Sequence, residues 1–115
     1  MISIQETGIV SAKDKALLIE AKEGIQEVIP GSTVLLYGSV ARSTQRSGSD
    51  YDILVLTQGP ISRDERIHSE NAILELELTH DVLLSTMYRT WSDWTDSLLT
   101  VSPFHREVEQ DGIVL

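Results

Sequence analysis

Two short apolar segments separated by a polar stretch constrain the fold of this chain more than any other feature. Residues 33–37 and 51–57 are continuous in apolar and β-branched side chains, which is typical of buried strands. Residues 38–49 between them include two Gly and five Ser or Thr, and this composition predicts a loop. The sequence therefore predicts a sheet with two core strands that are joined by a long polar connection.

Helices are predicted on both sides of this strand pair in the sequence. Apolar residues recur at helical spacing over residues 14–29, and Pro30 and Gly31 end that helix. The pattern from Ser62 to Glu65 matches a capping box, which opens a second helix. We expect that helix to extend to about Leu78, although leucines and glutamates alternate over residues 74–78 as they would in a strand.

The rest of the chain predicts one more strand and two short helices. Residues 81–88 are expected to form the strand, Ser92 to cap a short helix that carries Trp94, Leu98 and Leu99, and Ser102-Pro103 to open a last helix before Gly112. The order of these elements predicts an α/β (α+β) fold, with a small mixed β-sheet covered on one side by helices. We expect residues 1–115 to form a single domain, because no linker or repeat divides them.

The charge and composition restrict the classes of partner. The formal net charge is −9, and long nucleic acid is not an expected partner because its binding requires clustered Lys and Arg. No apolar run is long enough to cross a bilayer, so no membrane partner is expected. The absence of cysteine and of a signal-like N-terminus is consistent with a cytoplasmic location.

Asp50 and Asp52 are the strongest candidate for a chemical site. Side chains at positions i and i+2 of a strand point to the same face, so these carboxylates are expected to meet at the start of the second apolar segment. Paired carboxylates bind hard divalent cations through oxygen ligands. Such cations stabilise the attacking and leaving oxygens when phosphoryl groups are transferred.

Gly38 and Ser39 follow the first apolar segment and complete this candidate site. A glycine there allows the backbone to approach a phosphate closely, and Ser39 adds a hydroxyl donor. Arg42 could add a charged contact to the phosphates, and Arg46 is a weaker candidate for the same role. A different interpretation is that all these residues form an ordinary polar turn between two strands.

The stretch Gly38-Ser39-x-Ala41-Arg42, followed by Ser49-Asp50-x-Asp52-Ile53, resembles the motif of the polymerase β-like nucleotidyltransferase superfamily, in particular its minimal single-domain members. The resemblance implies a nucleotidyltransferase-like fold and the transfer of a nucleoside monophosphate from a triphosphate to an acceptor hydroxyl. It implies that Gly38, Ser39 and Arg42 bind the nucleotide, with ATP as the expected donor. It also implies that Asp50 and Asp52 bind Mg²⁺.

A third carboxylate on the next strand completes the site in many members of that family. The interior of the predicted third strand has no acid, so Asp81 at its start is the best candidate and Glu77 is a poorer one. Asp81 could equally serve only as a turn residue before the strand. The alternative to an enzyme is therefore a catalytically impaired module of the same fold that binds a nucleotide or a partner.

The same resemblance suggests protein partners. Minimal members are often paired with a separate helical protein of the HEPN type, as the antitoxin half of a toxin–antitoxin module. A chain of 115 residues has little room for its own acceptor-binding region. We therefore expect either a HEPN-type partner or a homo-oligomer to help hold the acceptor.

Overall fold

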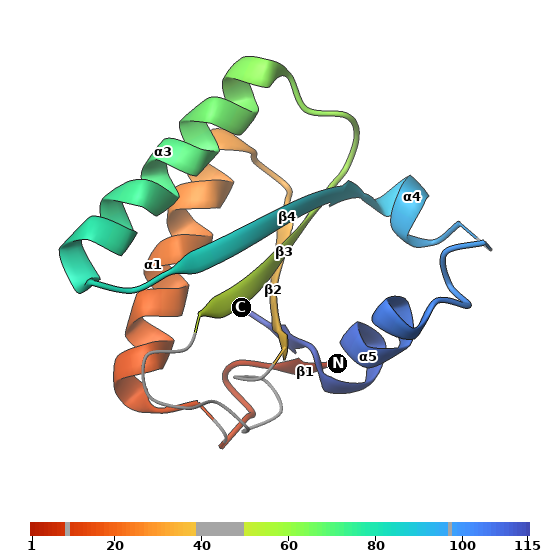
Figure 1. Ribbon diagram of the computed structural model, residues 1–115, viewed down its shortest axis with the longest axis horizontal. Helices are drawn as coiled ribbons and strands as arrows, with labels where there is room; N and C mark the ends of the chain where they lie inside the picture. Colours follow the sequence, from red (N-terminus) through yellow and green to blue (C-terminus); the bar gives the residue numbers. More distant parts are fainter. Residues whose placement is uncertain (9, 39–49, 97) are drawn as a thin grey trace.

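The two apolar segments form neighbouring strands inside a five-stranded mixed sheet (Figure 1). In a computed structural model that describes residues 1–8, 10–38, 50–96 and 98–115, the strand order is β1-β5-β2-β3-β4. The strands are β1 (Ile2–Ser3), β2 (Thr33–Tyr37), β3 (Tyr51–Thr57), β4 (Leu84–Thr90) and β5 (Ile113–Val114). β2 is antiparallel to both β3 and β5, whereas β3 pairs with β4, and β1 with β5, in parallel.

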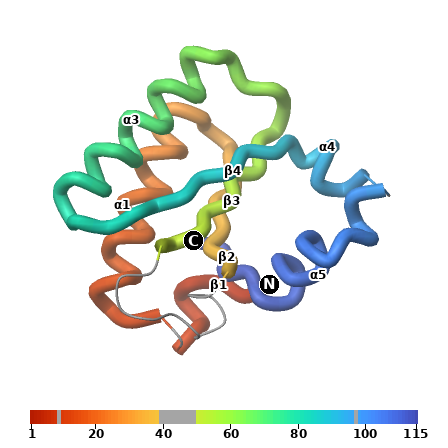
Figure 2. Tube along the Cα trace, viewed as in Figure 1, coloured from red at the N-terminus to blue at the C-terminus, as the bar shows by residue number. Residues whose placement is uncertain are grey.

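Two long helices, α1 (Ala12–Val28) and α3 (Arg63–His80), lie side by side on one side of the sheet (Figures 1 and 2). The side chain of Ser11 caps α1 by accepting a hydrogen bond from the Asp14 N–H at 3.1 Å. The predicted capping box of α3 is present, with both reciprocal bonds between Ser62 and Glu65. These caps satisfy N–H groups that the first helical turn leaves without a partner.

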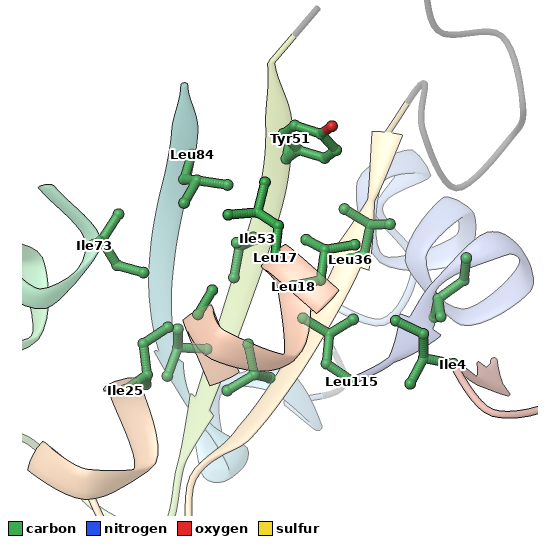
Figure 3. Packing of buried hydrophobic residues seen from close by; sticks show 14 of the residues in the cluster. Ile4, Leu17, Leu18, Ile25, Leu36, Tyr51, Ile53, Ile73, Leu84 and Leu115 are labelled. Carbon is green, nitrogen blue, oxygen red and sulfur yellow. The ribbon is translucent and has the colours of Figure 1, made fainter. Parts of the chain in front are cut away.

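The main core lies between these helices and the sheet. Helix α1 contributes Leu18, Ala21 and Ile25, all fully buried, and they pack against β-strand side chains that include Ile53 and Leu36 (Figure 3). Because β3 alternates its side chains between two faces, Tyr51, Ile53 and Val55 belong to this helix-covered face. Removal of these apolar side chains from water is the main way in which this face of the sheet stabilises the folded state.

The second face of the sheet is partly covered by the C-terminal helices α4 (Trp91–Trp94) and α5 (Pro103–Asp111), which lie on the other side from α1 and α3 (Figure 1). Their buried side chains Trp94 and Val108 pack against Leu35, Leu54 and Leu56. Helices therefore contact both faces, rather than only the one face expected from the sequence. The last helix begins and ends as predicted, with Ser102 at its N-cap and Gly112 at its C-cap.

The structure differs from the sequence-based expectations in one strand, one short helix and two strands that were not predicted. The third predicted strand, residues 81–88, is shifted, because α3 continues to His80 and β4 covers Leu84–Thr90. The side chain that caps α4 belongs to Thr90 rather than to Ser92, and α4 ends at Trp94 before the leucines. The two-residue strands β1 and β5 were not predicted, because only their pairing across the length of the chain stabilises them.

The long helices of this fold do not have membrane-spanning character. Within the described residues, none of them combines the length and the hydropathy that a bilayer span requires.

Candidate functional site

The candidate site is built where β2 ends and β3 begins. The two strands pair in antiparallel register, with Tyr37 opposite Asp52. Gly38 follows Tyr37 directly, so the end of β2 brings this glycine to the start of β3. Directly opposed residues in an antiparallel pair have Cβ atoms about 4.5–5.5 Å apart. Strand pairing alone therefore brings Gly38 and Asp52, which are 14 positions apart in the sequence, into one neighbourhood.

Gly38 has a backbone conformation and surroundings that exclude a side chain. Its φ is +79°, in the region that L residues rarely adopt. A Cβ at this position would overlap a carboxylate oxygen of Asp52 and lie 3.2 Å from the Asp52 Cγ. The carboxylate of Asp52 thus lies directly against the α-carbon of Gly38. A glycine of this kind provides the close backbone approach that a phosphate-binding turn requires.

Asp52 lies on the sheet face opposite to the one covered by α1 and α3. Tyr51 and Ile53 point into the helix-covered core, so Asp52 shares its face with Leu54 and Leu56. Asp52 is half-buried, whereas Asp50, immediately before β3, is exposed. The direction of the Asp50 carboxylate toward the same volume stays a prediction from its i, i+2 spacing.

Tyr51, between the two aspartates, fixes the start of β3 to helix α1. Its hydroxyl donates a hydrogen bond to Asp14 Oδ1 at 2.6 Å. The backbone N–H of Tyr51 also donates to the carbonyl of Leu83, at 3.0 Å. A short bond between a phenol and a carboxylate is among the stronger hydrogen bonds in proteins. Tyr51 therefore restrains the strand start that carries Asp50 and Asp52.

The pKa of the Tyr37 phenol depends on the charges of this site. Burial raises the pKa of its phenol above the ordinary value, the negative charge of Asp52 raises it further, and the positive charge of Arg89 opposes the shift. The ring also packs edge-on against Phe104, with the ring centroids 5.3 Å apart. Tyr37 and Asp52 thus interact both through strand register and through charge.

The neighbouring strand β4 presents no acid on the Asp52 face. Its parallel register places Ser85 beside Asp52, Met87 beside Leu54 and Arg89 beside Leu56. Arg89 was not singled out from the sequence. The only sequence pattern that points to Arg89 is the alternation of residues 85, 87 and 89 on one face of the strand. This pattern can be recognised only when the strand is placed at Leu84–Thr90.

Asp81 is the C-cap residue of α3 and does not lie on a strand. It has a left-handed backbone conformation, with φ of 53°, and it is exposed. Its neighbours face the side of α1, because His80 Nε2 lies 3.3 Å from a Glu20 carboxylate oxygen and Val82 packs against the helix-covered core. Among the described residues, no three His, Asp or Glu side chains are close enough to hold one metal ion. Asp81 and the aspartate pair therefore do not form a three-acid metal site within the described residues.

Three residues singled out in the polar stretch, Ser39, Arg42 and Arg46, lie outside the described residues. Their predicted contacts with phosphate stay predictions.

The chain is similar to known proteins both in sequence and in fold. The family model described as "Polymerase beta, Nucleotidyltransferase" matches residues 22–96, which include both aspartates and the glycine. A crystal structure of a toxin–antitoxin with AMP-PNP is similar in fold, with a TM-score of 0.57 and 20% identity, over 88% of this chain and 71% of that chain. No curated protein matches the chain significantly.

Proposed function

Since this chain belongs to the polymerase beta nucleotidyltransferase family, we propose that it transfers a nucleoside monophosphate from a nucleoside triphosphate, with ATP as the expected donor, to an acceptor hydroxyl. In this reaction the acceptor oxygen bonds to the α-phosphorus, and the bond from that phosphorus to the pyrophosphate oxygen breaks. Pyrophosphate leaves, and the hydroxyl proton passes to the surrounding water. Positioning and charge stabilisation supply most of the catalysis in such transfers.

The observation that carries this proposal is the contact between Gly38 and Asp52. A glycine with positive φ marks a backbone that a phosphate can approach, and the carboxylate against it marks the place where a cation would meet that phosphate. An ordinary polar turn does not require a carboxylate packed against a glycine α-carbon. The same contact therefore favours a nucleotide site over a simple connection between strands.

Asp50 and Asp52 fit the ligand set of Mg²⁺. This ion is usually held by one or two carboxylates together with substrate phosphates and water, so the pair is sufficient without a third acid. When bound there, Mg²⁺ would supply Lewis-acid stabilisation of the phosphate charge. In this proposal the two aspartates hold the ion, while Gly38, Ser39 and Arg42 hold the phosphates.

A catalytic role for Asp81 receives less support than the roles of the aspartate pair. Its neighbours lie on the helix-covered side, whereas Asp52 faces the other side of the sheet. The absence of a third acid near the pair, among the described residues, keeps a second candidate function open. In that alternative the chain binds a nucleotide or a protein partner and transfers nothing.

We further propose that the chain acts with a protein partner, as the antitoxin half of a toxin–antitoxin pair. The support is the fold it shares with a structure described as a toxin–antitoxin with AMP-PNP. A helical HEPN-type toxin is the expected partner and would carry the acceptor hydroxyl. A homo-oligomer is the other arrangement that could complete an acceptor site.

Transfer can be tested with α-³²P-labelled ATP and Mg²⁺, using protein and RNA acceptors that present hydroxyl groups. We expect label on an acceptor with wild type and none with Asp50→Asn/Asp52→Asn. The matched control is Glu23→Gln/Glu27→Gln, which removes two exposed charges from α1. Nucleotide binding without transfer to any acceptor would instead support the binding module. Equal labelling by all three proteins would show that the aspartate pair is not the site.

A further inference from the structure

A polar pocket lies at the carboxyl ends of the parallel strands β3 and β4, away from the aspartate pair. Its volume is about 330 Å³, and its lining includes Arg66, Arg89, Thr57, Thr90, Tyr88 and Asp93. The carboxyl ends of parallel strands are frequent places for ligand sites in sheets of this type. The chain has only nine Lys and Arg against 18 acids, so two arginines in one pocket concentrate its sparse positive charge.

Tyr88 contacts both guanidinium groups, one through its ring and the other through its backbone carbonyl. The Arg66 guanidinium lies over the tyrosine ring, 4.9 Å from the centroid, and its Nε donates to Glu70 at 2.9 Å. The Arg89 Nη1 donates to the Tyr88 carbonyl at 2.8 Å. The Tyr88 hydroxyl is in turn fixed by Ser69, at 2.7 Å. Tyr88 therefore anchors both arginines at one edge of the sheet.

Both arginines keep donors that their intramolecular bonds do not use. A guanidinium has five N–H donors, and each group spends one of them in the bonds just given. Within the described part of the chain, Arg89 has no ion pair. The Thr90 hydroxyl oxygen accepts a bond from the Asp93 N–H at 3.0 Å, so its own proton is available for a ligand.

This pocket is separate from the aspartate pair. Thr57 lies five positions after Asp52 in β3, which corresponds to about 16 Å at a rise of about 3.3 Å per residue. The two sites lie toward opposite ends of the same strand. A phosphate held beside Gly38 therefore cannot at the same time be the group that this pocket would hold.

We propose that the pocket binds the phosphate group of a small phosphorylated molecule. Guanidinium groups bind phosphate oxygens through paired, charge-assisted hydrogen bonds, and the Thr90 hydroxyl adds a neutral donor. The volume is at the lower end of the range for small-molecule sites, about 300–1,000 Å³, so a phosphate with a small organic group fits. Asp93 is the acid on the wall of the pocket, and its charge lowers the affinity for the ligand.

The test is an amide NMR titration of the ¹⁵N-labelled chain with inorganic phosphate and, separately, with ribose 5-phosphate, at constant ionic strength. We expect saturating shifts at the amides of Thr57, Arg89 and Thr90, with tighter binding of ribose 5-phosphate if the organic group is also recognised. Arg66→Gln and Arg89→Gln should each weaken binding about tenfold, as expected for the loss of one charge-assisted bond. Asp93→Asn should tighten it.

Two further variants make the result decisive. Arg63→Gln removes an exposed charge from the same helix outside the pocket, and Asp50→Asn/Asp52→Asn removes the other site; both should bind as wild type does. The proposal is overturned if no amide shifts saturate, or if Arg63→Gln weakens binding as much as Arg89→Gln does. Shifts confined to the start of β3 would also overturn it.

Discussion

The carboxylate of Asp52 lies against the α-carbon of Gly38, so a side chain at position 38 would collide with it. The antiparallel register of β2 and β3 creates this relationship, because it sets Asp52 opposite Tyr37, the residue before the glycine. Gly38 also has a positive φ, which a residue with a side chain adopts only with strain. A nucleotide site based on this contact depends on a glycine as much as on an acid.

The first prediction concerns Gly38→Ala. The change should destabilise the fold by about 1–2 kcal/mol from the positive φ alone, with an additional loss because the new Cβ displaces Asp52. Gly59→Ala is the matched control, because a Cβ there meets nothing within 4 Å and its φ is ordinary. Chemical denaturation measures both. Equal free energies of unfolding for the two variants would contradict the close contact between Gly38 and the Asp52 carboxylate.

The second prediction concerns the aspartate pair. With ATP and Mg²⁺ at a hundred times the dissociation constant, wild type should gain about 2.7 kcal/mol in its free energy of unfolding. Asp50→Asn/Asp52→Asn should gain little, because it lacks the carboxylates that we assign to the cation. Thermal melts of both proteins, with Glu23→Gln/Glu27→Gln as the charge-matched control, provide the measurement. An equal gain in the aspartate variant would place the cation elsewhere.

The third prediction concerns Asp81, for which glycine is the better replacement than alanine. Asp81 has a φ of 53°, which glycine adopts without strain, so Asp81→Gly should fold at least as stably as wild type. Its transfer rate should match that of wild type, because its flanking residues contact the helix-covered side. Single-turnover assays compare the two. A large loss of rate in a stable Asp81→Gly protein would make this carboxylate part of the mechanism.

The fourth prediction concerns the Tyr37 phenol. Because the charge of Asp52 raises its pKa and that of Arg89 lowers it, Asp52→Asn should lower this pKa and Arg89→Gln should raise it. The raised pKa also means that the unfolded chain loses this proton first, so folding stability should fall as the pH rises through and above about 10. Tyrosine-selective ¹³C NMR titrations measure the shift. Opposite signs in the two variants are the required result.

The sequence predicted the local features well, because short-range chemistry determines them. The strand at residues 33–37, the capping box of α3 and the boundaries of the last helix all agree with the structure. The capping box and the helix ends depend on neighbouring residues, and the apolar run that marks β2 is local, although β2 is also held by its pairing with β3 and β5. The polymerase beta-type fold that the motif implied is also confirmed.

Features that depend on distant parts of the chain were missed or misplaced. The apolar residues Val82 and Leu83 made the predicted strand begin too early. In the structure, Asp81 has a left-handed conformation at the end of α3, and β4 begins only at Leu84. Arg89 stayed unnoticed because its place on the Asp52 face depends on the β3–β4 register. The strands β1 and β5 have only two residues each, and no local pattern predicts them.

The pairing of β1 with β5 also has a consequence for how the chain reaches its native state. It brings the first and last residues together, and the Met1 ammonium donates to the Glu109 carbonyl at 2.7 Å, across a separation of 108 residues. Contacts of such high sequence separation slow folding, because a very long loop must close before they form. A circular permutant that joins these ends through a short linker and opens at Gly59 would make the same pairing local. It should therefore fold faster than the natural order while keeping every strand of the sheet.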